Sequence, residues 1–179
     1  MILFFGNVGS GKGTQAKLLA ERLNYPTIST GQLLRSSSDP KIKAVLDSGK
    51  LVNNEILCPL LEKELKRIRA DKNEFILDGF PRRVNQAKWL VDKIRRGELK
   101  FSVALCLNLT EETALERLKL RGRHDDTPIG IRQRFAEYET SVVPTIEYLQ
   151  SQGFKVIEID GNRSIEKVSA SIQKVFLVK

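Results

Sequence analysis

The feature that most constrains this chain is the glycine-rich segment at residues 6–14, Gly-Asn-Val-Gly-Ser-Gly-Lys-Gly-Thr. It follows an apolar run at residues 2–5 and precedes an amphipathic run at residues 15–23, which predicts a strand, a tight turn and a helix. Glycines let the backbone curl so that successive N–H groups point inward, and the helix start adds partial positive charge. The segment therefore predicts a loop that binds phosphates, with Lys12 reaching the outer phosphates of a nucleotide.

Residue 13 departs from the general form of this loop. Lys12 directly follows Gly11, and Gly6 stands five positions before Gly11, as the phosphate-loop pattern requires. Gly13, however, occupies the position where serine or threonine usually binds Mg²⁺, and Thr14 comes one step later. The alternative interpretation is a glycine-rich turn in a metabolic α/β domain that binds no triphosphate. The lysine and the flanking strand and helix favour the phosphate loop.

Length and composition are typical of one soluble globular domain. The 179 residues are 41% apolar, enough for one sizeable core, and no apolar run approaches the roughly 20 residues that span a membrane. Because the chain opens on a strand pattern, we expect no signal peptide. Cys58 and Cys106 lie far apart in apolar segments, which predicts buried, reduced thiols and a cytoplasmic protein. One histidine and no Cys-x-x-Cys pair argue against a zinc site.

The net charge of +8 has two interpretations. One is a surface that binds nucleic acid, and the other is a set of cations that serve a small, phosphate-rich ligand. Lysines and arginines are spread along the chain without a long basic run, and the aromatic fraction of 7% shows no RNA-binding pattern. We therefore expect a small-molecule ligand, with nucleic acid as the less favoured partner.

Short apolar runs alternate with helical patterns along the whole chain. Strands are expected at residues 2–5, 27–28, 74–77, 103–107 and 156–159. Helices are expected at residues 12–23, 31–36, 42–48, 54–69, 84–95, 111–120, about 128–150 and 165–175. Thr30 and Thr110 are the expected N-caps of two of them, and Pro144 is expected to kink the longest. The sequence thus predicts one three-layer α/β domain (residues 1–179) of P-loop NTPase type, a doubly wound five-stranded parallel sheet with helices on both faces.

A second expected strand ends in a carboxylate, Asp78, which Gly79, Phe80, Pro81 and Arg82 follow. An aspartate at this place can hold the water shell of Mg²⁺ opposite the phosphate loop. Gly79 allows close backbone approach, and the planar guanidinium of Arg82 can bind two phosphate oxygens at once. The alternative is an ordinary turn with a surface arginine.

Arginines gather again between residues 117 and 134. Arg117 and Arg121 are four residues apart and share one face of a helix, where like charges repel unless an anion lies between them. Arg123 follows, then two aspartates at 125 and 126, and Arg134 lies on the next expected helix. A solvated basic face is one interpretation. We favour a hinged clamp that closes around phosphates.

Six segments, in this order, resemble the adenylate kinase family, the nucleoside monophosphate kinases with a short lid. They are the loop with Gly-Thr-Gln at 13–15, Ile-Ser-Thr-Gly-Gln-Leu-Leu-Arg at 28–35, Gly-Lys-Leu-Val at 49–52, Asp78 to Arg82 with Gln86, Arg-Gly-Arg-His-Asp-Asp at 121–126, and Asp-Gly-Asn-Arg at 160–163. The resemblance covers nearly the whole chain. It implies an acceptor-binding segment at residues 29–52 and a short lid at 120–134 without the zinc-bearing insert of longer relatives.

The resemblance also implies a role for each matching residue. The donor ATP is expected at Gly9, Ser10, Gly11, Lys12, Gly13, Thr14, Arg117, Arg121 and Arg163. The acceptor AMP is expected at Thr30, Arg35, Lys50, Leu51, Val52, Gly79, Phe80, Arg82, Gln86, Arg123 and Arg134. The expected catalytic residues are Lys12, Arg82, Arg121, Arg123 and Arg134, and Asp78 is expected to hold the Mg²⁺ of MgATP through water.

This chain departs from the family pattern at three places. Val8 replaces the usual proline of the loop, Gln32 replaces an aspartate near the water shell of the metal, and the stretch from Arg35 to Lys50 is short. Pyrimidine-using relatives commonly carry alanine and asparagine in place of Thr30 and Gln86. A glutamine amide can both donate and accept a hydrogen bond, which suits the edge of adenine and favours AMP over UMP or CMP.

The implied reaction is reversible phosphoryl transfer from MgATP to AMP, giving two ADP, by a monomer. The acceptor phosphate is already anionic, so alignment and charge neutralisation suffice, and about six negative charges on the two nucleotides meet the arginines and Lys12. Closure of the lid is expected to exclude water. The alternatives are a UMP/CMP kinase, a nucleic-acid-binding protein that retains this fold, and an inactive nucleotide-binding subunit.

Overall fold

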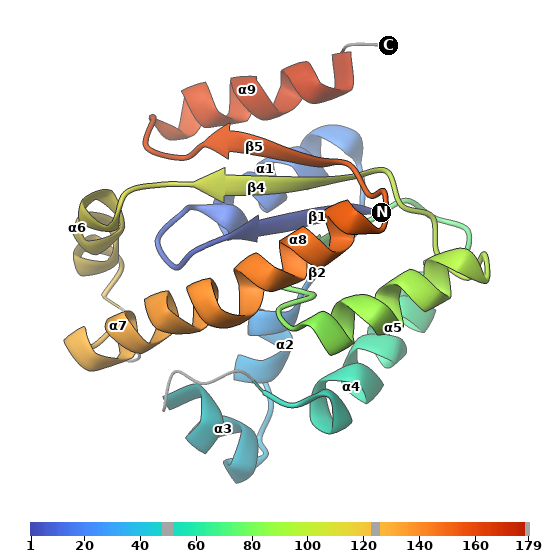
Figure 1. Ribbon diagram of the computed structural model, residues 1–179, viewed down its shortest axis with the longest axis horizontal. Coiled ribbons are helices and arrows are strands. Elements are labelled where there is room, and N and C mark those ends of the chain that lie inside the picture. The colour runs from blue at the N-terminus through green and yellow to red at the C-terminus, as the bar shows by residue number, and fades with distance from the viewer. Residues whose placement is uncertain (48–51, 123–125, 178–179) are drawn as a thin grey trace.

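Five parallel strands form the centre of the computed structural model, which describes residues 1–47, 52–122 and 126–177 (Figure 1). The strands are β1 (Ile2–Gly6), β2 (Thr27–Ser29), β3 (Ile76–Asp78), β4 (Val103–Asn108) and β5 (Val156–Asp160). Their order across the sheet is β2-β3-β1-β4-β5, with β2 and β3 on one side of β1 and β4 and β5 on the other. The predicted doubly wound parallel sheet is confirmed.

Both faces of this sheet are buried, because successive side chains of each strand point to opposite faces. Leu3 and Phe5 of β1 belong to one apolar cluster, and Ile2 and Phe4 belong to another on the opposite face. Every residue of β1 is buried, which explains why the strand appears in the sequence as a continuous apolar run rather than an alternating one.

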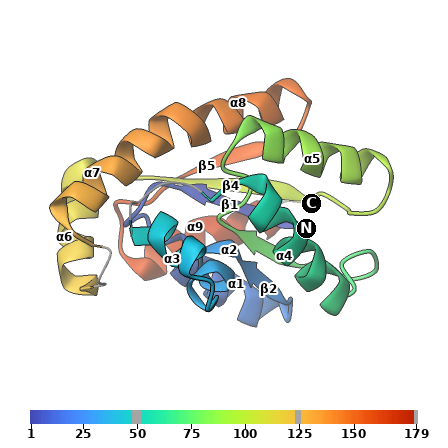
Figure 2. The ribbon, with the colours of Figure 1, turned by 90° about the horizontal axis from the view of Figure 1, so that it is seen from below.

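Helices cover both faces, as predicted. They are α1 (Lys12–Leu23), α2 (Thr30–Arg35), α3 (Pro40–Asp47), α4 (Asn54–Arg67), α5 (Val84–Arg95), α6 (Glu111–Arg121), α7 (Pro128–Glu137), α8 (Val143–Ser151) and α9 (Ile165–Leu177). Figure 2 shows α1 and α9 on one side of the sheet and α5 and α8 on the other. Helices α1 and α9 bury their apolar stripes in the cluster of Ile2 and Phe4, whereas α4, α5 and α8 pack on that of Leu3 and Phe5. No helix within the described ranges is long and apolar enough to span a bilayer.

Three local predictions need correction or refinement. Helix α2 begins at Thr30 itself, so Thr30 is not the N-cap, whereas Thr110 caps α6 by accepting from the N–H of Thr113. Cys58 is only half-buried on α4, although Cys106 on β4 is buried as expected. At the position of the predicted kink, a π-helical turn (Tyr138–Val142) joins α7 to α8 and ends two residues before Pro144, which has no N–H to donate.

Candidate active site

A cleft of about 1330 Å³ opens at the carboxyl ends of the central strands. This is where an open α/β sheet places its ligand, because loops from both sides of the central strand meet there. Most of the residues singled out from the sequence line this cleft: Gly9, Ser10, Gly11, Lys12, Gly13, Thr14, Thr30, Arg35, Val52, Asp78, Gly79, Arg82, Gln86, Arg117, Arg121, Arg134 and Arg163.

The loop between β1 and α1 has the backbone geometry of an anion nest. Gly9 and Gly11 adopt φ angles of +80° and +82°, which side chains with a Cβ rarely tolerate. Gly9 also lies so close to α6 that an added Cβ would be 2.9 Å from the Cα of Ala114. The side chain of Asn7 closes the turn by accepting from the N–H of Val8 at 2.7 Å. Sequence and tertiary packing thus impose the same conformation on this loop.

Lys12 lies at the start of α1 and reaches back over the loop, donating to the backbone carbonyl of Asn7 at 2.9 Å. Burial lowers the pKa of Lys12 to about 8; the positive charges of Arg82 and Arg121 act in the same direction, and Asp78 opposes them. An anion that enters the cleft would stabilise the protonated form of Lys12 and raise its pKa, because a nearby negative charge favours the charged ammonium.

Asp78, the last residue of β3, is buried below the phosphate loop. Its Oδ2 accepts from the hydroxyl of Ser29 at 3.2 Å, and an added Cβ on Gly13 would be 3.7 Å from the same oxygen. Within the described residues its Oδ1 is enclosed without a hydrogen-bond donor. A buried carboxylate that faces the phosphate loop through one oxygen and has no donor on the other fits the water shell of Mg²⁺.

The turn after β3 forms the opposite wall of the cleft. Gly79 adopts φ of +81°, and its carbonyl accepts both from the Thr30 hydroxyl at 2.8 Å and from Nε of Arg82 at 2.9 Å. The N–H of Arg82 donates to Oε1 of the buried Gln86 at 2.8 Å. These bonds fix the guanidinium of Arg82 and the amide of Gln86 relative to each other, as preorganised binding requires.

Among the described residues that were predicted for the acceptor, Phe80 is the one that does not line the cleft. Its side chain is fully buried and packs edge-on against Trp89, with ring centroids 5.7 Å apart, rather than lining the cleft. The sequence therefore identified the turn correctly, but this side chain belongs to the core.

Two arginines from different helices meet on one carboxylate above the phosphate loop. Nε of Arg121, at the end of α6, donates to Asp126 at 2.8 Å, and Nη2 of Arg134, on α7, donates to the same carboxylate at 3.1 Å. The side chain of Asp126 is 3% exposed. Arg121 and Arg134, which the sequence assigns to a clamp around phosphates, thus both bind Asp126, the anion that holds these like charges together.

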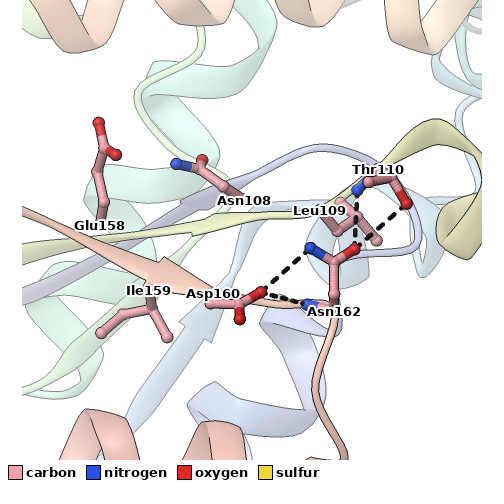
Figure 3. Close-up of a pocket in the computed structure, with 7 residues that line it drawn as sticks. All are labelled: Asn108, Leu109, Thr110, Glu158, Ile159, Asp160 and Asn162. Carbon is pink, nitrogen blue, oxygen red and sulfur yellow. Dashed lines mark hydrogen bonds between the residues drawn. The ribbon is translucent and has the colours of Figure 1, made fainter.

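The far end of the cleft lies beside the loop between β5 and α9. Nη2 of Arg117 donates to the backbone carbonyl of Arg163 at 3.0 Å, and Nε of Arg163 donates to Asp160 at 2.9 Å. On the outer side of this loop, Figure 3 shows Asn162 between Asp160 and Thr110. The planar guanidinium of Arg117 is thereby held against the loop.

Three of the predicted site residues lie outside the described residues: Lys50 and Leu51 of the expected acceptor segment, and Arg123 of the expected lid. Val52, which follows the first of these gaps, is buried and contributes to the cleft wall.

Comparisons with known proteins agree with this geometry. A match to the family described as adenylate kinase extends over residues 4–154. Adenylate kinase 1 of a Synechocystis species is 38% identical over 97% of this chain and 95% of its own length. Adenylate kinase of a Caulobacter species is 38% identical over 99% and 98%, and that of Corynebacterium urealyticum is 35% identical over 94% of each chain. The chain belongs to the adenylate kinase family.

Sequence reasoning assigned no role to three residues that hold the functional groups of the cleft in place. Asn7 closes the phosphate loop, Ser29 donates to Asp78, and Asp126 pairs with two arginines. The acid beside the arginine cluster was a signal for Asp126, since buried like charges need a counter-charge. Asn7 and Ser29 carried no signal beyond their frequency in turns and at helix starts.

Proposed function

We propose that the protein catalyses reversible phosphoryl transfer from MgATP to AMP, giving two molecules of ADP. The observation that supports this most is the layout of the cleft. A phosphate nest with Lys12 forms one wall, the turn with Arg82 forms the opposite wall, and Arg121 and Arg134 lie above. Membership in the adenylate kinase family supports the same reaction.

The two nucleotides enter from opposite ends. The donor triphosphate binds the loop from Gly9 to Thr14 and Lys12, with its base beside Arg117 and the loop at Arg163. The acceptor monophosphate binds Arg35 and Arg82, with its base toward Thr30, Val52 and Gln86. The amide oxygen of Gln86 already accepts from the N–H of Arg82, so its Nε2 is the group that donates to a ring nitrogen of adenine.

Catalysis follows from alignment and charge. The acceptor oxygen belongs to an ionised phosphate, so the chain need supply no strong base. Arg82, Arg121 and Arg134 instead stabilise the charge that spreads over the transferred group, from positions that other parts of the fold hold in advance. As phosphates enter, their oxygens compete with Asp126 for Arg121 and Arg134 and draw the two helices toward the cleft.

Asp78 is the residue that would hold Mg²⁺, through water. The metal supplies neutralisation of charge on the donor phosphates. In this structure the role of the chain is to keep Oδ2 of Asp78, which faces Gly13, oriented by Ser29, and to leave Oδ1 without a donor among the described residues.

The remaining assignments are also proposals. Residues 29–52 form the acceptor-binding segment and residues 120–134 the lid of a single domain. The cleft has room for both nucleotides within one chain, which is compatible with a monomer. Light scattering would test the monomer, metal analysis the expected lack of zinc, and cell fractionation the cytoplasmic location inferred from Cys58 and Cys106.

The deciding experiment is a coupled assay of ADP formation from MgATP and AMP with the wild type, R82A and R83A. Arg82 lies in the cleft, whereas its neighbour Arg83 pairs with Glu137 at 3.6 Å and is a matched control. We expect R82A to lower kcat by about 10²- to 10³-fold with unchanged circular dichroism, and R83A to retain most of its activity. Full activity of R82A would contradict the assigned role.

A panel of acceptors separates the alternatives. We expect AMP to be used far better than UMP or CMP, since a mismatched base leaves Nε2 of the buried Gln86 without an acceptor. Preference for a pyrimidine would support the UMP/CMP kinase. Failure to turn over any acceptor, together with salt-dependent binding of RNA, would support the nucleic-acid alternative.

A further inference from the structure

Gln15 connects two loops that are distant in sequence. It lies in the first turn of α1, one residue after the phosphate loop, and is 3% exposed. Its Nε2 donates to the backbone carbonyl of Ile165, the first residue of α9, at 2.9 Å. A buried amide that spans 150 positions of sequence fixes the distance between the structures it joins.

The loop that Gln15 holds is the one at the far end of the cleft, residues 160–165. Three contacts hold the outer part of this loop to β4 and α6. The N–H of Gly161 donates to the carbonyl of Asn108 at 2.6 Å, Asn162 accepts from the N–H of Thr110 at 2.9 Å (Figure 3), and Arg117 donates to the carbonyl of Arg163. Gln15 alone, among the described hydrogen bonds of side chains, ties the inner part of the loop to the helix that follows the phosphate nest.

Gln15 also lies in the cleft wall, between Thr14 on one side and Ser164 and Ile165 on the other. Its Oε1 is enclosed without a hydrogen-bond donor within the described residues. A buried amide oxygen that lacks a donor lowers the free energy of unfolding. An apolar side chain of similar size would therefore stabilise the fold about as well as the Gln15 amide does. Its placement is better explained by the geometry of the cleft.

We propose that Gln15 is a positioning residue that sets the span of the donor site, from the phosphate nest to the base beside Arg117 and Ile165. A nucleoside triphosphate must engage both ends at once, so its affinity depends on the spacing that the bond from Gln15 to Ile165 fixes. A ligand that occupies the phosphate nest alone does not depend on this spacing. The inference rests on the donor site given under Proposed function.

The experiment compares ATP with inorganic tripolyphosphate, which fills the phosphate nest but has no base. In Q15L the carbonyl of Ile165 loses its donor while side-chain volume is nearly kept. We expect the KM for ATP to rise about three- to tenfold, as for one lost buried hydrogen bond. We expect kcat, the KM for AMP and the competitive inhibition constant of tripolyphosphate to stay within about twofold.

Two further variants control for folding. Q173L makes the same chemical change at a partly buried glutamine on α9, whose Nε2 donates to Ser169 at 3.3 Å away from the cleft, and should leave every kinetic constant unchanged. Q15M repeats the test with a flexible side chain, so that a poorly folding Q15L does not end the experiment.

Three other results would each contradict the inference, and each has a different meaning. Equal weakening of ATP and tripolyphosphate would mean that Gln15 supports the phosphate loop locally. An unchanged KM for ATP in both Gln15 variants would mean that the bond to Ile165 does not matter. If tripolyphosphate does not compete with ATP in the wild type, the assignment of the donor site itself fails, and the inference fails with it.

Discussion

The cationic side chains of the cleft repel one another, and two carboxylates offset this repulsion. Asp126 joins Arg121 and Arg134, and Asp78 acts on both Lys12 and Arg82. Burial lowers the pKa of Arg82 as well as that of Lys12, so the empty cleft carries charge that it does not fully compensate. Such a site gains electrostatic free energy when phosphates enter.

This arrangement predicts a pH dependence of ATP capture. Because the pKa of Lys12 is about 8 in the empty cleft, the lysine loses its proton as the pH rises through 8, and its charge with it. We expect kcat/KM for ATP, which reports the free enzyme, to fall about tenfold between roughly pH 7 and pH 9. Bound phosphates raise the pKa of Lys12, so kcat should begin to fall only at higher pH. Parallel pH profiles of kcat and kcat/KM would contradict this interpretation.

At the scale of elements, the phosphate loop depends on its packing against α6. Gly9 and Gly11 share nearly the same positive φ, but their surroundings differ. An added Cβ on Gly9 would be 2.9 Å from the Cα of Ala114, a fully buried residue of α6, whereas one on Gly11 would meet open space. The position of α6, and thus of Arg117 and Arg121, is linked to the absence of a side chain at residue 9.

The comparison of G9A with G11A tests this link. Both variants carry the strain of a left-handed alanine, about 1–2 kcal/mol. G9A must also displace backbone atoms of α6, so we expect its free energy of unfolding to be at least about 1 kcal/mol lower than that of G11A. Urea-induced unfolding followed by circular dichroism measures the difference. Equal stabilities would show that α6 moves aside without cost.

At the scale of the whole molecule, the sheet buries both faces and leaves its carboxyl ends to form the cleft. The helices on either face are held by two separate apolar clusters, whereas α6 and α7 extend beyond the carboxyl ends of the strands (Figures 1 and 2). Polar contacts such as that of Asp126 with Arg121 and Arg134 hold this region over the cleft. A ligand that spans the cleft should therefore connect α6 and α7 to the strand ends and loops on the other side of the cleft, which the apolar core does not do.

A bridging ligand is expected to stabilise the fold strongly. At a concentration 100 times its Kd, a compound with two adenosines joined by a pentaphosphate adds about 2.7 kcal/mol. For a chain of this size that corresponds to a rise in Tm of roughly 5–10 °C. Differential scanning calorimetry with the pentaphosphate, ATP and AMP measures it. A bridging ligand no more effective than ATP at the same concentration would mean that the cleft holds one nucleotide at a time.

Local patterns were sufficient to predict much of this protein. The apolar runs predicted the five strands, most clearly the central β1, in which every residue is buried, although the edge strands β2 and β5 also carry exposed polar residues. The glycines with Lys12 predicted the loop after β1. The arginines of the cleft were also identifiable, since few side chains can bind several phosphates. The features that the sequence did not predict depend on contacts with residues in other parts of the fold. The hydroxyl of Thr30 bonds to Gly79, not to its own helix, and the side chain of Phe80 packs on Trp89.

The sequence by itself therefore determined which elements form and which chemistry they carry, because helical and strand periodicity, turn residues and charge are local properties. Only the tertiary structure decided the partners. Asp126 lies between Arg121 and Arg134, and Gln15 meets Ile165, because the order β2-β3-β1-β4-β5 brings the carboxyl ends of distant strands to one edge. Contacts between residues so far apart in the chain follow from the packing of whole elements, and no local pattern encodes them.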